Sequence, residues 1–308
     1  MFRRLATPLL ALAALAAAGH APAFAQSAQP TPSATPAPQE TAPPPIQEEK
    51  RKETQQKTAR GSRDLKNNPT GEQVAEFVIA IYGNSYGRAM LNQVRRTGIE
   101  RGRTTRVGAE NRTEEVTYEQ RFIRGESFAK DKLRLDQKTP TVEYSLVYNE
   151  GAIFGIINNT PFTPRTEHTT NFLTPAYHGI DALLRYKENG STVTFVAKDK
   201  QKNIDLWIID LADKEKRKTR YYVSANPDVR LTARVLWLEY ERADPAGGDP
   251  VKYKQTFHDY RVAQGTLVPF RSVLYANGKQ IEETRVQTVT YGVKMDDSYF
   301  KNPEAAAN

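Results

Sequence analysis

The 308-residue sequence contains no cysteine, only four histidines, and no long apolar run after its first 18 residues. Without cysteine there is no disulfide, no thiol nucleophile, no zinc–thiolate site and no attachment point for a bacterial lipoprotein anchor. The fold therefore has to depend on an apolar core. One histidine, His20, lies in the N-terminal segment, and the other three are not spaced like a metal-binding pair on a helix.

A phosphate-binding loop is absent as well. Two pairs of acidic residues resemble the paired carboxylates of hydrolases, namely Asp296 with Asp297 and Asp210 with Asp213. The first pair fits the cap of a short turn, and the second fits a loop between strands. The sequence predicts that the protein is not an enzyme, holds no metal and uses no cofactor.

The N-terminal segment has the pattern of a secretory signal peptide. Arg3 and Arg4 precede an apolar run over residues 5–18, and Ala23-Phe24-Ala25 is a small-x-small cleavage site. The alternative is a membrane anchor, but the run is too short, because crossing a bilayer takes roughly 20 apolar residues. We expect residues 1–25 to be removed after Ala25, the protein to be periplasmic, and no stable membrane insertion.

Residues 26–69 are expected to form a disordered tether, which is Pro-rich at first and then charged. Neither part carries an apolar stripe, so burial cannot offset the entropy lost on ordering. The folded domain is predicted at residues 70–303, with a short tail at residues 304–308. The net charge of +8 is spread along the chain. Together with the lack of a recognition motif, this spread argues against a nucleic-acid partner.

Helical periodicity is clearest at the start of the predicted domain. Thr70 and Gln73 match a capping box, and apolar residues then recur at helical spacing up to residue 94. Two glycines within this stretch predict a break or bend. A second helix is predicted over residues 171–186, and the Pro-containing segment 161–177 is expected to act as a mobile entry loop.

The rest of the domain alternates with period two, which is typical of strands. In the first such segment Val116, Tyr118 and Phe122 share one face. Similar segments recur up to residue 292, and Asn277-Gly278 is a strong hairpin turn. About ten strands with short connections are expected. The predicted fold class is mainly β with α: a single curved antiparallel sheet forming an incomplete β-barrel closed by helices.

The C-terminal half carries a family pattern. It consists of residues 231–240, Phe257-His-Asp-Tyr-Arg261, Gly265-Thr-Leu-Val-Pro269, Asn277-Gly-Lys279 and the ending over residues 291–303. With the order of helices and strands before it, this pattern resembles the LolA/LolB-like outer-membrane lipoprotein-sorting family, whose fold is shared with the sensor-regulator RseB. The resemblance covers about residues 70–303, and no single motif within it is specific.

The resemblance implies an apolar cavity that shields the acyl chains of lipoproteins in transit, with membrane-bound donor and acceptor proteins as partners. It also implies a latch, in which an arginine of an early strand hydrogen-bonds to the backbone of the lid, and Arg124 is the candidate. The alternative for Arg124 is a solvated strand end. Phe77 and Ile81 in the first helix are the expected lid residues. The tether and the larger size depart from the soluble carrier of the family.

An apolar ligand needs little beyond apolar surface, since each buried methylene contributes about 0.8 kcal/mol. Each inward residue could instead simply fill the core, and a one-residue slip of register would reverse its face. The expected cavity residues are Val116, Tyr118, Phe122, Tyr144, Leu146, Phe195, Trp207, Val235, Trp237 and Phe257.

The sequence thus predicts a periplasmic binding or carrier protein that holds lipid or the acyl chains of lipoproteins for transfer to the outer membrane. The alternative is an RseB-like envelope sensor or protein-interaction module without transfer activity, in which the tether reaches a partner. A third reading is a structural domain with a fully packed barrel and no ligand.

Overall fold

The structure is a computed structural model that describes residues 69–108, 112–228, 231–244 and 247–303. The predicted signal peptide, the tether up to residue 68 and the C-terminal tail lie outside the described residues. Within the described ranges, none of the helices is both long and apolar enough to cross a membrane.

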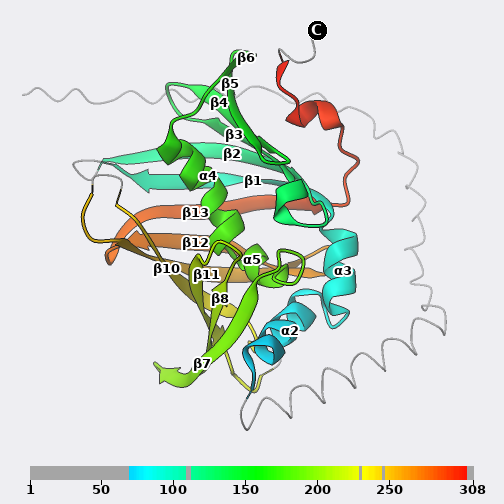
Figure 1. The fold of residues 1–308 in the computed structure, drawn as a ribbon, viewed down its shortest axis with the longest axis vertical. Helices are drawn as coiled ribbons and strands as arrows, with labels where there is room; N and C mark the ends of the chain where they lie inside the picture. Colours follow the sequence, from blue (N-terminus) through cyan, green and yellow to red (C-terminus); the bar gives the residue numbers. More distant parts are fainter. Residues whose placement is uncertain (1–68, 109–111, 229–230, 245–246, 304–308) are drawn as a thin grey trace, which may run out of the picture. The chain divides into compact units, whose positions relative to one another are not determined.

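The strands of the described chain form one antiparallel sheet of 13 strands, in the order β6-β5-β4-β3-β2-β1-β13-β12-β11-β10-β9-β8-β7 (Figure 1). The first half is a meander of β1 Thr97–Val107, β2 Thr113–Ile123, β3 Lys132–Lys138, β4 Glu143–Asn149, β5 Ala152–Ile157 and β6 Thr160–Phe162. The second half is a meander of β7 Thr192–Gln201, β8 Ile204–Ala212, β9 Lys218–Ser224, β10 Val235–Arg242, β11 Val251–Ala263, β12 Thr266–Ala276 and β13 Lys279–Tyr291. This open, helix-covered sheet confirms the predicted fold class.

The connectivity explains why helices cover one face of the sheet. β1 pairs with β13, so the two edges of the sheet are β6 and β7, which follow one another in the chain. The connection between them has to pass from one edge to the other across a face. It contains α4 Thr166–His178 and α5 Ile180–Leu184, which lie over the strands in Figure 1. We call the face under these helices the inner face.

The N-terminal helical region follows the sequence prediction closely. Thr70 caps α2 Gly71–Tyr82 in a capping box with Gln73, and the glycine-containing turn after it leads into α3 Gly87–Val94. The apolar side of α2 is buried against β7–β12 together with α5, in the largest apolar cluster of the described chain.

The second helix differs from its prediction. It starts at Thr166 rather than at residue 171, and Gly179 separates α4 from α5. The segment 161–177 is therefore not an entry loop, because it holds the end of β6 and most of α4. Phe172 and Leu173 of α4 pack on the inner face of β3–β5. These apolar contacts hold α4 in place despite Pro175 inside it.

The outer face of the sheet carries charge instead. Arg121 of β2 forms ion pairs with Glu119 and Asp136, and Arg134 of β3 bonds Asp136 at 2.8 Å. The alternation of charged outer residues with apolar inner ones is the period-two pattern of the sequence. Over β3–β5 the outer face is also covered by η3 Asp297–Phe300, which buries Phe300 completely.

Candidate functional site

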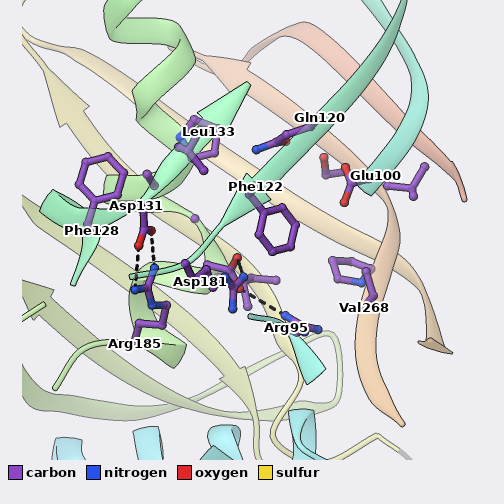
Figure 2. Close-up of a pocket in the computed structure, with 18 of the residues that line it drawn as sticks. Arg95, Glu100, Gln120, Phe122, Phe128, Asp131, Leu133, Asp181, Arg185 and Val268 are labelled. Carbon is purple, nitrogen blue, oxygen red and sulfur yellow. Dashed lines mark hydrogen bonds and ion pairs between the residues drawn. The ribbon is translucent and has the colours of Figure 1, made fainter. Parts of the chain in front are cut away.

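A cavity of about 250 Å³ lies between the inner face of the sheet and the α4–α5 connection (Figure 2). Its volume is close to the lower end of the range for ligand pockets, about 300 to 1,000 Å³. The apolar part of its wall comes from both meanders and from α4, and includes Phe122, Leu133, Phe172, Phe257 and Val286.

The floor of the cavity, defined as Arg95, Arg124 and Asp181, is charged. Arg95 directly follows α3, Arg124 directly follows β2, and Asp181 lies in α5. Arg95 Nη1 donates to Asp181 Oδ1 at 3.3 Å, and Arg124 Nη2 donates to Asp181 Oδ2. Burial alone would raise the pKa of Asp181, but the neighbouring arginines outweigh it and hold this pKa below its usual value. Asp181 is therefore a carboxylate.

A second ion pair stands beside the floor. Arg185 Nη2 donates to Asp131 Oδ1 at 3.1 Å and to the carbonyl of Gly125 at 2.9 Å. Both side chains are nearly inaccessible, at 10% and 4% exposure. The backbone N–H of Gly125 completes the arrangement by donating to Asp131 at 2.8 Å. This pair ties the segment after α5 to the loop between β2 and β3, as Figure 2 shows.

Glu100 of β1 is the remaining acidic group of the wall. It accepts a hydrogen bond from the Tyr118 hydroxyl at 2.8 Å. Burial raises the pKa of Glu100; the Tyr118 hydrogen bond and the charge of Arg95 oppose this rise, and Asp181 adds to it. Glu100 is thus held toward its neutral, protonated form.

The structure brings three of the predicted site residues to the cavity wall, namely Phe122, Arg124 and Phe257. The others are distributed around it. Val116 and Tyr118 are buried on the same face of β2, and Tyr144 and Leu146 pack under α4. Phe195, Trp207 and Val235 belong to the cluster beneath α2, so they fill core rather than line the cavity.

Trp237 lies on the outer face, contrary to the prediction. A register shift between Val235 and Trp237 reverses the alternation within β10. Val235 and Leu238 consequently point into the core, whereas Trp237 stacks on Tyr222 with ring centroids 4.4 Å apart. A β-bulge of this kind leaves no clear mark in an apolar strand sequence.

The expected lid residues Phe77 and Ile81 lie at the main core cluster, whereas the expected latch Arg124 lies at the cavity floor. Phe77 is buried edge-on against Trp207, with ring centroids 5.9 Å apart, and Ile81 is packed beside the same cluster. Arg124 connects the end of β2 to α5, but through the carboxylate of Asp181 and not through a backbone carbonyl. Its side chain is only 13% exposed, so it is not a solvated strand end.

The charged residues around Arg124 escaped the sequence analysis. Arg95, Asp131, Asp181 and Arg185 come from three separate segments, and only the fold brings them together. One clue was present, because Asp181 and Arg185 are four residues apart in the predicted helix and so share one side of it. That spacing is common on solvated helices and does not predict burial.

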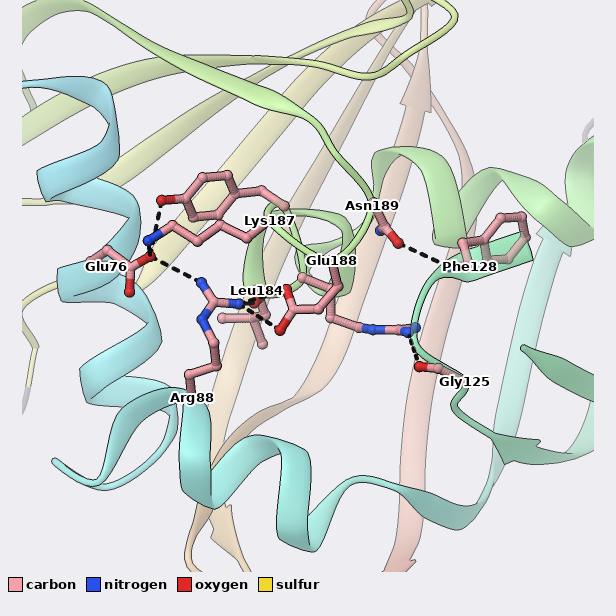
Figure 3. A network of polar contacts seen from close by, with 10 residues as sticks. Glu76, Arg88, Gly125, Phe128, Leu184, Lys187, Glu188 and Asn189 are labelled. Carbon is pink, nitrogen blue, oxygen red and sulfur yellow. Dashed lines mark hydrogen bonds and ion pairs between the residues drawn. The ribbon is translucent and has the colours of Figure 1, made fainter. Parts of the chain in front are cut away.

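A polar cluster joins α2 and α3 to α5 and the residues that follow it (Figure 3). Arg88 of α3 donates to Glu188 at 2.6 Å, to Glu76 of α2 at 3.0 Å and to the carbonyl of Leu184 at 3.1 Å. Asn189 accepts from the backbone N–H of Phe128 at 3.0 Å. The α5 segment is therefore fastened to both neighbouring helices and to the loop after β2.

The sequence also contains one Gly-x-Ser-x-Gly pentapeptide, at residues 83–87. In hydrolases this pattern makes a sharp turn from a strand into a helix. Here it connects two helices, and Ser85 has no hydrogen bond to a histidine among the described residues. The pentapeptide is thus a helix–helix turn and lacks the setting of a catalytic serine.

Comparison with known proteins identifies the fold. No protein-family model and no curated protein sequence matches the chain. A LolA superfamily protein from Nitrosomonas europaea superposes with a TM-score of 0.50 at 7% identity, covering 76% of this chain and 98% of that chain. A DUF1329 family protein from Desulfovibrio piger gives a TM-score of 0.52 at 11% identity, covering 74% and 98%. The chain therefore has the LolA-like fold that its sequence pattern predicts.

Proposed function

We propose that the protein is a periplasmic binding or carrier protein that holds lipid, or the acyl chains of lipoproteins, for transfer to the outer membrane. The observation that carries this proposal is the cavity between the inner face and α4–α5, with phenylalanines contributed by both meanders and by α4. The N-terminal signal pattern supports the periplasmic location. Membrane-bound donor and acceptor proteins would be its partners.

In this proposal α4 acts as a lid that opens and closes. Apolar packing of Phe172 and Leu173 holds α4 to the sheet. At its outer side Arg242 of β10 donates to Thr174 at 2.8 Å and to Asn171 at 3.1 Å. All of these are side-chain contacts, so lifting α4 would leave the strand pairing of the sheet intact. Lifting α4 would open the cavity to an acyl chain.

The test is native mass spectrometry with lipid extraction on the protein purified from a bacterial envelope fraction. The cavity-filling variant is Ser272→Phe, because Ser272 lines the cavity from β12. Its matched control is Thr117→Phe, which adds an aromatic ring at an exposed position of β2. Wild type and control are expected to carry an acyl lipid or lipopeptide that Ser272→Phe loses. An empty wild-type protein that also takes up no fluorescent fatty acyl probe would contradict the proposal.

A further inference from the structure

The floor of the cavity has more positive than negative charge. Arg185 is matched by Asp131, which it contacts with both of its terminal nitrogens. Arg95 and Arg124, in contrast, share the single carboxylate of Asp181. Two guanidinium groups that converge on one carboxylate leave one positive charge without an acidic partner in the floor.

Arg124 has unused hydrogen-bonding capacity. A guanidinium carries five N–H donors. Arg95 uses all three of its nitrogens, on Thr266 Oγ1 at 3.2 Å, on Asp181 and on the carbonyl of Leu267 at 2.7 Å. Among the described residues, the guanidinium of Arg124 hydrogen-bonds only to Asp181. An additional acceptor can therefore be bound at Arg124 without breaking another bond.

The floor is open to a ligand and adjoins the apolar wall. Asp181 is 46% exposed, although both arginines that it pairs with are nearly buried. The guanidinium carbon of Arg124 lies 5.1 Å from the centre of the Phe122 ring, which lines the cavity. A molecule that enters the cavity thus meets aromatic surface and a guanidinium side by side.

Glu100 does not cancel the excess charge of the floor by direct contact, because among the described residues it forms no ion pair with Arg95 or Arg124. It is also occupied by the hydroxyl of Tyr118. The polar lining near Arg124 consequently favours an anion over a neutral or cationic group.

We infer that Arg124, supported by Arg95, binds the anionic headgroup of an amphiphile, a carboxylate or a phosphate monoester, whose tail lies against the apolar wall of the same cavity. This inference rests on the proposed binding function and specifies the class of ligand. Arginine suits both headgroups because its planar fork donates two parallel hydrogen bonds to either. The incoming anion uses the free donors of Arg124 while Asp181 stays bound, and it competes with Asp181 only for the positive charge of that guanidinium.

The experiment measures binding of four ligands of equal chain length to the full-length mature protein by isothermal titration calorimetry. The ligands are decanoate, decyl phosphate, decyl maltoside and decyltrimethylammonium, all below the concentrations at which they form micelles. Acetate and inorganic phosphate, tested in parallel, distinguish an amphiphile from a free anion. Decanoate or decyl phosphate is expected to bind at least about tenfold more tightly than the neutral and cationic ligands, the factor typical of one charged hydrogen bond.

Three variants locate the effect. Arg124→Gln is expected to lose this preference, so that its affinity for decyl phosphate falls to that for decyl maltoside. Asp181→Asn removes the competing carboxylate and is expected to tighten the binding of the acidic ligands, an increase that a merely structural role of Asp181 would not produce. Arg103→Gln is the control, because Arg103 pairs with Glu115 on β1 and β2 at 54% exposure, outside the cavity lining.

The outcomes separate the two proposals. Equal uptake of all four decyl ligands, with no effect of Arg124→Gln, would overturn the headgroup site and leave the proposed function intact. No uptake of any decyl ligand would overturn the proposed function and the headgroup site together. Acetate or phosphate binding as tightly as its decyl counterpart would show a plain anion site and overturn the amphiphile.

Discussion

Arg185 and Asp131 form the most deeply buried ion pair beside the cavity, and a buried charge is costly once its partner is removed. We expect Arg185→Gln to lower the free energy of unfolding by about 3 to 5 kcal/mol. Arg103→Gln, at an exposed pair on the outer face, should cost no more than about 1 kcal/mol. Urea unfolding followed by circular dichroism measures both. An equal decrease in the free energy of unfolding in both variants would show that the buried pair stabilises the fold no more than the exposed pair does.

His178 makes stability depend on pH. Burial, with the nearby charge of Arg217, lowers the pKa of this imidazole from 6.5 to about 4. It is 5% exposed and stacks on Tyr240, with its Nδ1 2.7 Å from the Thr219 hydroxyl. The folded protein therefore keeps His178 neutral at pH values at which the unfolded chain takes up a proton.

Stability is consequently expected to fall as the pH decreases from about 6.5 to about 4, by about 3 kcal/mol from this residue. Replacing His178 with Gln removes the titrating group, so this part of the pH dependence should disappear even if the variant is less stable overall. Urea unfolding of both proteins at several pH values between 4 and 7 gives the two slopes. Parallel slopes would show that His178 is protonated in the folded state as readily as in the unfolded chain.

At the scale of elements, the sequence predicted best where apolar and polar residues alternate regularly. Leu133 and Leu135 of β3 pack on the inner face as their period-two pattern indicates, and Asn277-Gly278 forms the expected hairpin turn, with both φ angles positive. β1 was missed because most of its side chains are polar or charged, and several pair with acidic residues on neighbouring strands. The cavity floor was missed for a similar reason: partners distant in the sequence decide which charges are buried.

The start of α2 depends on a glycine because this helix meets the backbone of β7. A Cβ on Gly71 would lie 2.5 Å from the carbonyl carbon of Thr194 and 2.6 Å from the carbonyl oxygen of Val193. In most helices Gly→Ala stabilises by about 1 kcal/mol. Here we expect Gly71→Ala to destabilise by about 1 to 3 kcal/mol, since β7 has to move.

Thermal and urea unfolding test this expectation against Gly108→Ala, whose Cβ would meet its nearest atom, the carbonyl oxygen of Arg112, at an ordinary 3.6 Å. A Gly71→Ala protein as stable as wild type would show that α2 and β7 do not pack this closely in solution.

At the scale of the whole molecule, the pairing of β1 with β13 determines where a site can form. It makes consecutive strands the two edges of the sheet, and the connection between them has to cross the inner face. The cavity lies under that connection, and its lining among the described residues runs from Tyr82 to Tyr291. We therefore expect the folded domain alone to take up the ligand, and the tether not to be needed for uptake.

Deletion of residues 26–66 tests this division. Because the described strand pairings and the cavity lining all lie beyond residue 66, the deleted protein is expected to keep the thermal midpoint and the ligand uptake of the full-length protein. A carrier should also keep its transfer of lipid between vesicles or proteins. Cross-linking in the envelope identifies partner proteins of the full-length protein. If the deleted protein keeps its ligand uptake but no longer cross-links to such a partner, the tether binds that partner. This result would favour the sensor alternative over the carrier. Loss of uptake itself would place part of the binding site in the tether, contrary to the assignment of the cavity to the domain alone.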